Sequence, residues 1–75
     1  RAALARIEAA EESLRGLGFG TLRVRDHGAR ARVELSEADL ERARTQAGEL
    51  ATRLAPHGFV ELELALYRRA TTGTA

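Results

Sequence analysis

Strict alternation between apolar and polar residues in three short segments constrains the fold of this chain more than any other feature. The segments cover residues 21–26, 29–35 and 59–67. Successive side chains of a β-strand point to opposite faces of a sheet, so each segment predicts a strand with one apolar face. A glycine turn signal at residues 26–28 joins the first two segments and predicts a β-hairpin. The apolar positions are Leu22, Val24, Ala31, Val33, Leu35, Val60, Leu62, Leu64 and Leu66.

Two longer segments repeat apolar residues at the three- and four-residue steps of a one-sided helix. They predict one helix over residues 2–17 and a second from residue 37 to residue 54 or 55. Gly18 ends the first helix in a left-handed cap conformation, and Ser36 caps the start of the second. The Pro-His-Gly sequence of residues 56–58 ends the second helix.

The expected order is helix, strand, strand, helix, strand. It predicts an α+β domain with a three-stranded antiparallel sheet and two helices on one face. The third strand can lie beside the first or, through a parallel crossover, beside the second. Strands of parallel sheets are usually continuously apolar, so the alternation favours the antiparallel sheet with the first strand in the middle. We expect one domain over residues 1–69 and a flexible tail over residues 70–75; the helical, uncapped start predicts a piece of a longer protein.

Composition excludes several kinds of function. The chain has no cysteine, which excludes disulfides, thiolate metal sites and a cysteine nucleophile. It has no Ser–His–Asp set, HExxH, GxGxxG or P-loop, so we assign it no catalytic residue, metal site or cofactor of its own. No apolar run is long enough to span a membrane and no signal peptide opens the chain, which favours a soluble cytoplasmic protein. A net charge of +1 argues against nonspecific nucleic-acid binding.

The face of the sheet without helices is expected to be polar, and two interpretations of it are open. All twelve cations of the chain are arginines, each a planar fork suited to carboxylate or phosphate. In one interpretation the face is solvated and holds cross-strand Arg–Glu pairs. In the other, Arg23 and Arg25 project from one strand and bind an anion, phosphate above all. The polar positions are Arg23, Arg25, Arg30, Arg32, Glu34, Glu61 and Glu63.

Four stretches of the sequence resemble one known family when they are taken together. They are residues 6–19 (RIEAAEESLRGLGF), 22–25 (LRVR), 27–28 (HG) and 31–34 (ARVE). The chain is similar, from about residue 4 to residue 69, to the C-terminal domain of the ATP-dependent sacrificial sulfur transferases. These enzymes belong to the PP-loop ATP pyrophosphatase superfamily and help to build the nickel-pincer nucleotide cofactor of lactate racemase.

The resemblance implies a function for this chain as part of a larger enzyme. An N-terminal PP-loop domain would bind ATP and Mg and adenylate a carboxylate of the substrate, with sulfur coming from a cysteine or an iron–sulfur cluster upstream. The C-terminal domain would bind the phosphate of a pyridinium mononucleotide and contribute to homo-oligomer contacts. By motif position, Arg23, Arg25 and Arg68 would bind the substrate phosphate, and Glu11 or Glu12 would be an acidic residue of the site.

Two other functions are weighed against this one. The chain also fits a non-catalytic dimerisation module, as in GMP synthetases of the same superfamily, pairing through its polar sheet face or the edge of the third strand. RNA binding on the arginine-bearing face is the weakest alternative. Sheets that bind RNA stack the bases on aromatic side chains. This chain has only one tyrosine and two phenylalanines, and both phenylalanines lie at helix ends.

Overall fold

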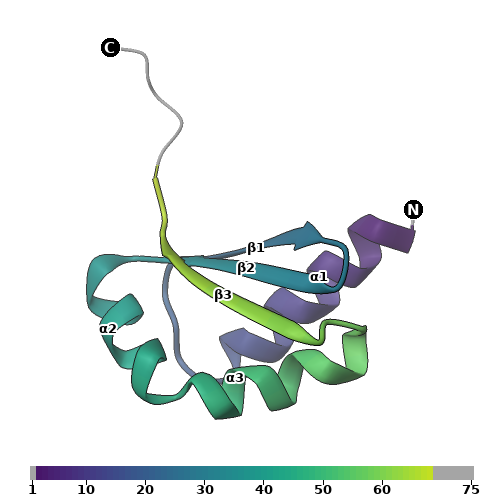
Figure 1. Ribbon diagram of the computed structural model, residues 1–75. Helices are drawn as coiled ribbons and strands as arrows, with labels where there is room; N and C mark the ends of the chain where they lie inside the picture. The colour runs from purple at the N-terminus through teal and green to yellow at the C-terminus, as the bar shows by residue number, and fades with distance from the viewer. Residues whose placement is uncertain (1, 69–75) are drawn as a thin grey trace.

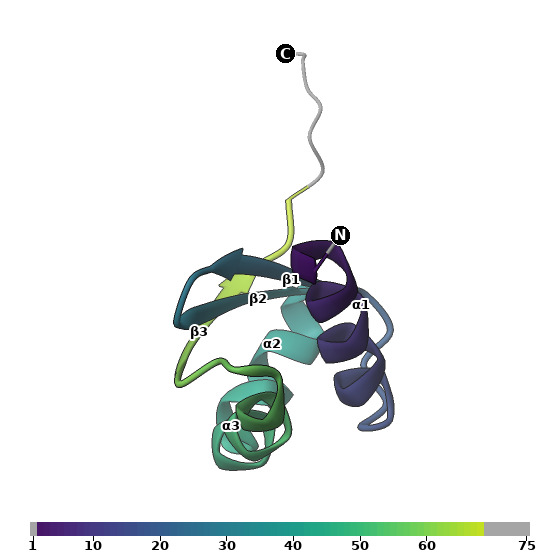
Figure 2. The same cartoon turned by 90° about the vertical axis from the view of Figure 1, so that its right-hand side faces the viewer.

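The computed structural model describes residues 2–68, which form a three-stranded sheet with the helices packed on one face (Figures 1 and 2). In chain order the elements are α1 (Ala2–Arg15), β1 (Leu22–His27), β2 (Arg30–Leu35), α2 (Glu37–Thr45), α3 (Ala47–Leu54), the 3-10 turn η1 (Ala55–His57) and β3 (Glu61–Leu66). The predicted α+β class is confirmed. The predicted tail lies outside the described residues. No helix within residues 2–68 is long and apolar enough to cross a membrane.

The order of the strands differs from the favoured prediction. β2 is the central strand, antiparallel to β1 and parallel to β3, so the expected antiparallel sheet with the first strand in the middle is wrong. The chain leaves β2, crosses beneath the sheet through α2 and α3, and returns along β3 in the same direction (Figure 1). Alternation did not distinguish the two arrangements. Strands in parallel sheets are continuously apolar when both faces of the sheet are covered, but only one face of this sheet is covered, so its parallel strand alternates as an antiparallel one does.

The hairpin of β1 and β2 forms as the glycine turn signal predicts. Val24 lies opposite Val33, and the register continues to the turn, where His27 lies opposite Arg30. Gly28 has a φ of 76°, a region that side chains with a Cβ rarely adopt, and its N–H donates to Asp26 Oδ1 at 2.9 Å. The turn therefore requires the glycine.

The second predicted helix is two helices. Its start is as predicted, because Ser36 Oγ accepts the N–H of Asp39 at 3.2 Å. Gln46 leaves helical geometry, with φ −112° and ψ 21°, and separates α2 from α3. At this break the N–H of Gln46 donates to the carbonyl of Ala43, and the hydroxyl of Thr45 donates to the carbonyl of Arg42. These contacts over three residues replace the regular four-residue bonds of a continuous helix.

The apolar faces of sheet and helices meet in one core. Its largest fully buried side chains are Leu14, Val33, Leu35, Leu50 and Leu54. Two buried phenylalanines belong to this core, Phe19 after α1 and Phe59 after η1. An arginine guanidinium packs against the ring of each. Arg42 lies 4.4 Å from the ring centroid of Phe19, and Arg6 lies 3.9 Å from that of Phe59. Arg6 also donates to the carbonyl of Gly28, which ties α1 to the hairpin turn.

Candidate anion-binding site

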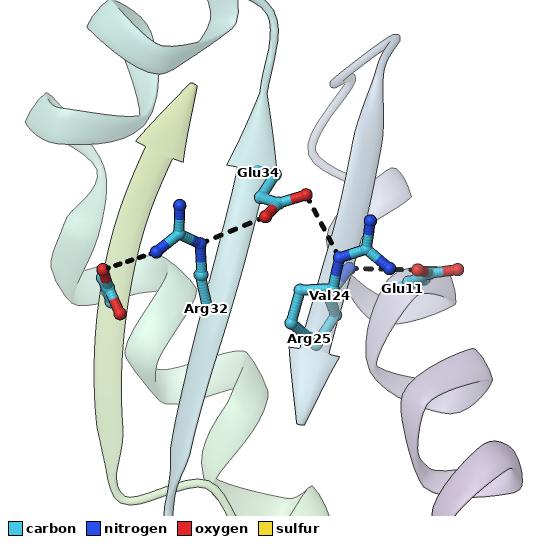
Figure 3. A network of polar contacts seen from close by, with 6 residues as sticks. Glu11, Val24, Arg25, Arg32 and Glu34 are labelled. Atoms are coloured by element: carbon cyan, nitrogen blue, oxygen red, sulfur yellow. Dashed lines mark hydrogen bonds and ion pairs between the residues drawn. The ribbon is translucent and has the colours of Figure 1, made fainter. Parts of the chain in front are cut away.

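The face of the sheet away from the helices carries a chain of ion pairs that crosses all three strands (Figure 3). Arg25 Nε lies 3.2 Å from Glu34 Oε1, and Arg32 Nε lies 3.1 Å from Glu34 Oε2. Arg32 continues to Glu63 on β3 at 3.1 Å, and Arg30 approaches the same carboxylate at 3.9 Å. For these residues the interpretation as a face of cross-strand Arg–Glu pairs is confirmed. Each such pair between partly exposed side chains contributes at most about 1 kcal/mol to stability.

Arg23 lies on this face but takes part in none of the ion pairs described above. It lies on β1 directly opposite Glu34 in the register of the hairpin. Both oxygens of Glu34 are already in contact with Arg25 and Arg32. Among residues 4–68 no hydrogen bond or ion pair of the exposed Arg23 side chain is found. Its positive charge is therefore not compensated by a described carboxylate.

Arg25 is positioned by Glu34 but still has hydrogen-bond donors available for a ligand. Its contact with Glu34 uses Nε alone, and about half of its side chain is exposed. The two terminal nitrogens of the guanidinium have no hydrogen-bond partner within residues 4–68. Arg23 and Arg25 leave the same face of β1 two residues apart, a separation of about 6.5 Å along a strand. Two forks at this spacing can contact the oxygens of one phosphate group.

A groove runs between α1 and the outer edge of β1, beside these arginines. One wall is formed by residues 23–27 of β1 and the other by Leu4, Ile7, Glu8 and Glu11 of α1. The groove is open because β1 is an edge strand of the sheet. The strand wall carries Arg23 and Arg25 together with the carboxylate of Asp26, which lies 3.5 Å from Arg6 Nε, and the helix wall carries the carboxylates of Glu8 and Glu11.

The structure distinguishes the two acidic candidates. Glu11 is buried, lines the groove and accepts the backbone N–H of Val24 at 3.0 Å (Figure 3). The side chain of Glu12 is 82% exposed, and its carboxylate lies 3.7 Å from Arg15. Only Glu11 is part of the groove. The helical period could have separated them, since Glu11 lies on the stripe of the buried Leu14, three residues further on.

Arg68 lies apart from the other two predicted phosphate ligands. It is exposed and directly follows Tyr67, whose N–H donates to the carbonyl of Leu35. It thus comes after β3, at the opposite edge of the sheet from β1, with β2 between them. Within one chain the structure brings together Arg23, Arg25 and Glu11 but not Arg68.

Of the helix wall of the groove, Glu11 was a predicted site residue, whereas Leu4, Ile7 and Glu8 were not. A second polar contact was also not predicted. Ser13 Oγ lies 3.0 Å from His57 Nε2, joining α1 to η1 in a half-buried position. No carboxylate contacts His57 within residues 4–68, so this pair lacks the third group of a catalytic triad and ties two elements together. The described residues also hold no cluster of three His, Asp or Glu that could bind a metal ion.

Comparison with models of known protein families and with curated proteins found no match to this chain.

Proposed function

We propose that this chain is the substrate-phosphate-binding and assembly domain of an ATP-dependent PP-loop sulfur transferase that thiolates a pyridinium mononucleotide. The proposal rests on the sequence resemblance and on one structural observation. Arg23 and Arg25 stand side by side on the open face of β1, with the charge of Arg23 uncompensated among the described residues. Guanidinium groups bind phosphate through charge-assisted hydrogen bonds, often two at a time.

The two walls of the groove support a ligand with charges of both signs. A phosphate would lie at the strand wall, where Arg23 and Arg25 donate. A pyridinium ring carries a positive charge, and the carboxylate of Glu8 on the helix wall complements it. Glu11 is less available to the ligand, since one of its oxygens accepts the N–H of Val24 and the other lies 3.7 Å from Arg15. The arrangement therefore favours a pyridinium mononucleotide over inorganic phosphate.

The described residues do not provide the other parts of such an enzyme. They offer neither a metal-binding cluster nor a cysteine, so ATP, Mg and the sulfur donor would be bound by the N-terminal domain that the resemblance implies. The part played by this chain is to bind and orient the substrate. Arg68 is remote from Arg23 in its own chain, so within one chain the phosphate would be bound by Arg23 and Arg25.

The proposal is tested by calorimetric titration of the 75-residue chain with a pyridinium mononucleotide and with the same nucleoside lacking its phosphate. Binding should need the phosphate. Arg23→Ala should weaken it about 10- to 100-fold, the worth of a charge-assisted hydrogen bond. Arg44→Ala removes an equal charge from an exposed site on α2, where Arg44 contacts Glu41, and should leave the affinity unchanged. Equal binding of nucleoside and nucleotide would contradict the proposal.

A further inference from the structure

The outer edge of β3 presents backbone groups that the sheet does not use. The N–H of Glu61 donates to the carbonyl of Ala29, directly before β2, and the N–H of Tyr67, directly after β3, donates to the carbonyl of Leu35. In a parallel ladder alternate residues of a strand bond to one neighbour, so the odd-numbered residues of β3 face β2. The N–H and C=O groups of Leu62, Leu64 and Leu66 therefore point outward. No side chain within residues 4–68 forms a hydrogen bond with them.

This edge lacks the features that usually block strand addition, whereas the opposite edge has them. On β1 the buried Glu11 accepts the outward N–H of Val24, and α1 lies along the edge. The β3 segment contains no proline or lysine, and its carboxylates point to the open face. There Glu63 contacts Arg30 and Arg32. An uncovered, regular edge of this kind is a template for another strand.

Apolar side chains continue along the same edge. Val60 is 79% exposed and Leu66 is 38% exposed, while Leu62 and Leu64 are only partly buried. Beside Val60 and Leu62 a mainly apolar groove is lined by Leu54 and Phe59. A strand added here would bury these side chains as well as satisfy the backbone.

We propose that the β3 edge pairs antiparallel with the β3 edge of a second copy, about a two-fold axis at Leu64. Leu64 then lies opposite its own copy, and Leu62 lies opposite Leu66. These positions are the ones with outward backbone groups, so the pairing forms about six hydrogen bonds between the copies. The result is one continuous sheet of six strands, three from each copy, with the helices of both copies on the same face.

For a second copy as the partner, charge favours this register. On the open face the two-fold at Leu64 places Glu63 opposite Ala65 and Glu61 opposite Tyr67, so no carboxylate faces another. A two-fold at Glu63 would place that carboxylate opposite its own copy, which is unfavourable. A two-fold at Ala65 would place Leu62, within β3, opposite the charged Arg68, whereas in the proposed register Arg68 lies opposite Val60, outside the strand. In the proposed register Leu66 of the second copy lies over Leu62, at the mouth of the apolar groove.

The mass of the chain in solution tests the pairing. Sedimentation equilibrium over a range of concentrations should show a monomer–dimer equilibrium between 8.1 kDa and twice that mass. Leu66→Lys places a charge in the edge and should shift the equilibrium to the monomer, with the fold checked by circular dichroism. Ala38→Lys adds the same charge at an exposed site on α2 and should leave the dimer intact. A wild-type chain that stays monomeric up to about 1 mM, which limits the dimer to a free energy weaker than about 4 kcal/mol, overturns the proposal.

Crosslinking tests the register. Because the chain has no cysteine, a single introduced cysteine can form a disulfide only between copies. Leu64→Cys should crosslink under mild oxidation, since opposed residues have Cα atoms about 5.5 Å apart, within disulfide range. Leu62→Cys is the matched control, because two copies of residue 62 would lie about 13 Å apart. Crosslinking of the control but not of Leu64→Cys contradicts the register, and crosslinking of neither contradicts the pairing.

This inference is independent of the phosphate site. Arg23 lies on β1, the opposite edge strand, so Leu66→Lys should leave nucleotide binding unchanged and Arg23→Ala should leave the mass unchanged. A failure of one proposal is thereby distinguished from a failure of the other.

Discussion

The backbone N–H of Val24 donates to the buried carboxylate of Glu11 at 3.0 Å and so joins the edge strand β1 to helix α1. This contact satisfies a donor that would otherwise lie unpaired at the edge of the sheet. It also fixes the distance between the two walls of the groove beside Arg23 and Arg25. The position of the candidate site thus depends on a carboxylate that need not itself contact the ligand.

Removing this carboxylate should destabilise the fold. Glu11→Ala leaves the N–H of Val24 without its partner, and we expect a loss of about 1–3 kcal/mol in the free energy of unfolding. Glu11→Gln keeps an acceptor and should lose less. Glu12→Ala is the matched control, because Glu12 is exposed and should cost no more than about 0.5 kcal/mol. Urea denaturation measures all three, and equal losses for Glu11→Ala and Glu12→Ala would contradict the structural role of Glu11.

Two glycines should respond in opposite directions to the same substitution. An added Cβ meets no atom within 4 Å at either Gly28 or Gly48, so only backbone conformation separates them. Gly48→Ala lies in α3 and should stabilise the chain by about 0.5–1 kcal/mol. Gly28→Ala must hold a φ of 76° and should destabilise it by about 1–2 kcal/mol. Thermal unfolding checks the pair, and a shift of both melting temperatures in the same direction would count against this geometry of the turn or of the helix.

Glu34 competes with a bound anion for Arg25 and Arg32. Glu34→Gln removes a negative charge beside the site, and we expect phosphate affinity to rise about two- to fivefold, the scale of an exposed charge interaction. Glu41→Gln removes the same charge from a remote position on α2 and serves as the control. Titration of both variants with inorganic phosphate measures the effect. A fall in affinity for Glu34→Gln would mean that the orientation of Arg25 matters more than the competing charge.

The sequence predicts the elements of this fold better than their neighbours in space. Alternation locates the strands, and the glycines at positions 18 and 58 mark helical ends with φ of 92° and 90°. Alternation cannot order the strands, because it reports burial on one face and is the same for parallel and antiparallel pairing. The break at Gln46 has no strong sequence signal, since glutamine is a good helix former.

The sequence also predicts some parts of the candidate site and not others. Alternation correctly places Arg23 and Arg25 on the face without helices. The expectation that the strand carrying them is central is wrong, and as a result the groove opens at an edge, against α1. Which arginine Glu34 would contact depends on side-chain geometry, which the register alone does not determine. The distinction between Glu11 and Glu12 was available from helical phase.

The most direct test of the central claim follows the arginine side chains themselves. Nuclear magnetic resonance resolves the Nε–Hε groups of arginines, and inorganic phosphate can be added stepwise to the chain. The account predicts saturable shifts at Arg23 and Arg25, with Arg44 on α2 unaffected. Shifts of similar size at all arginines, rising without saturation, would show nonspecific ion binding and contradict a phosphate site on β1.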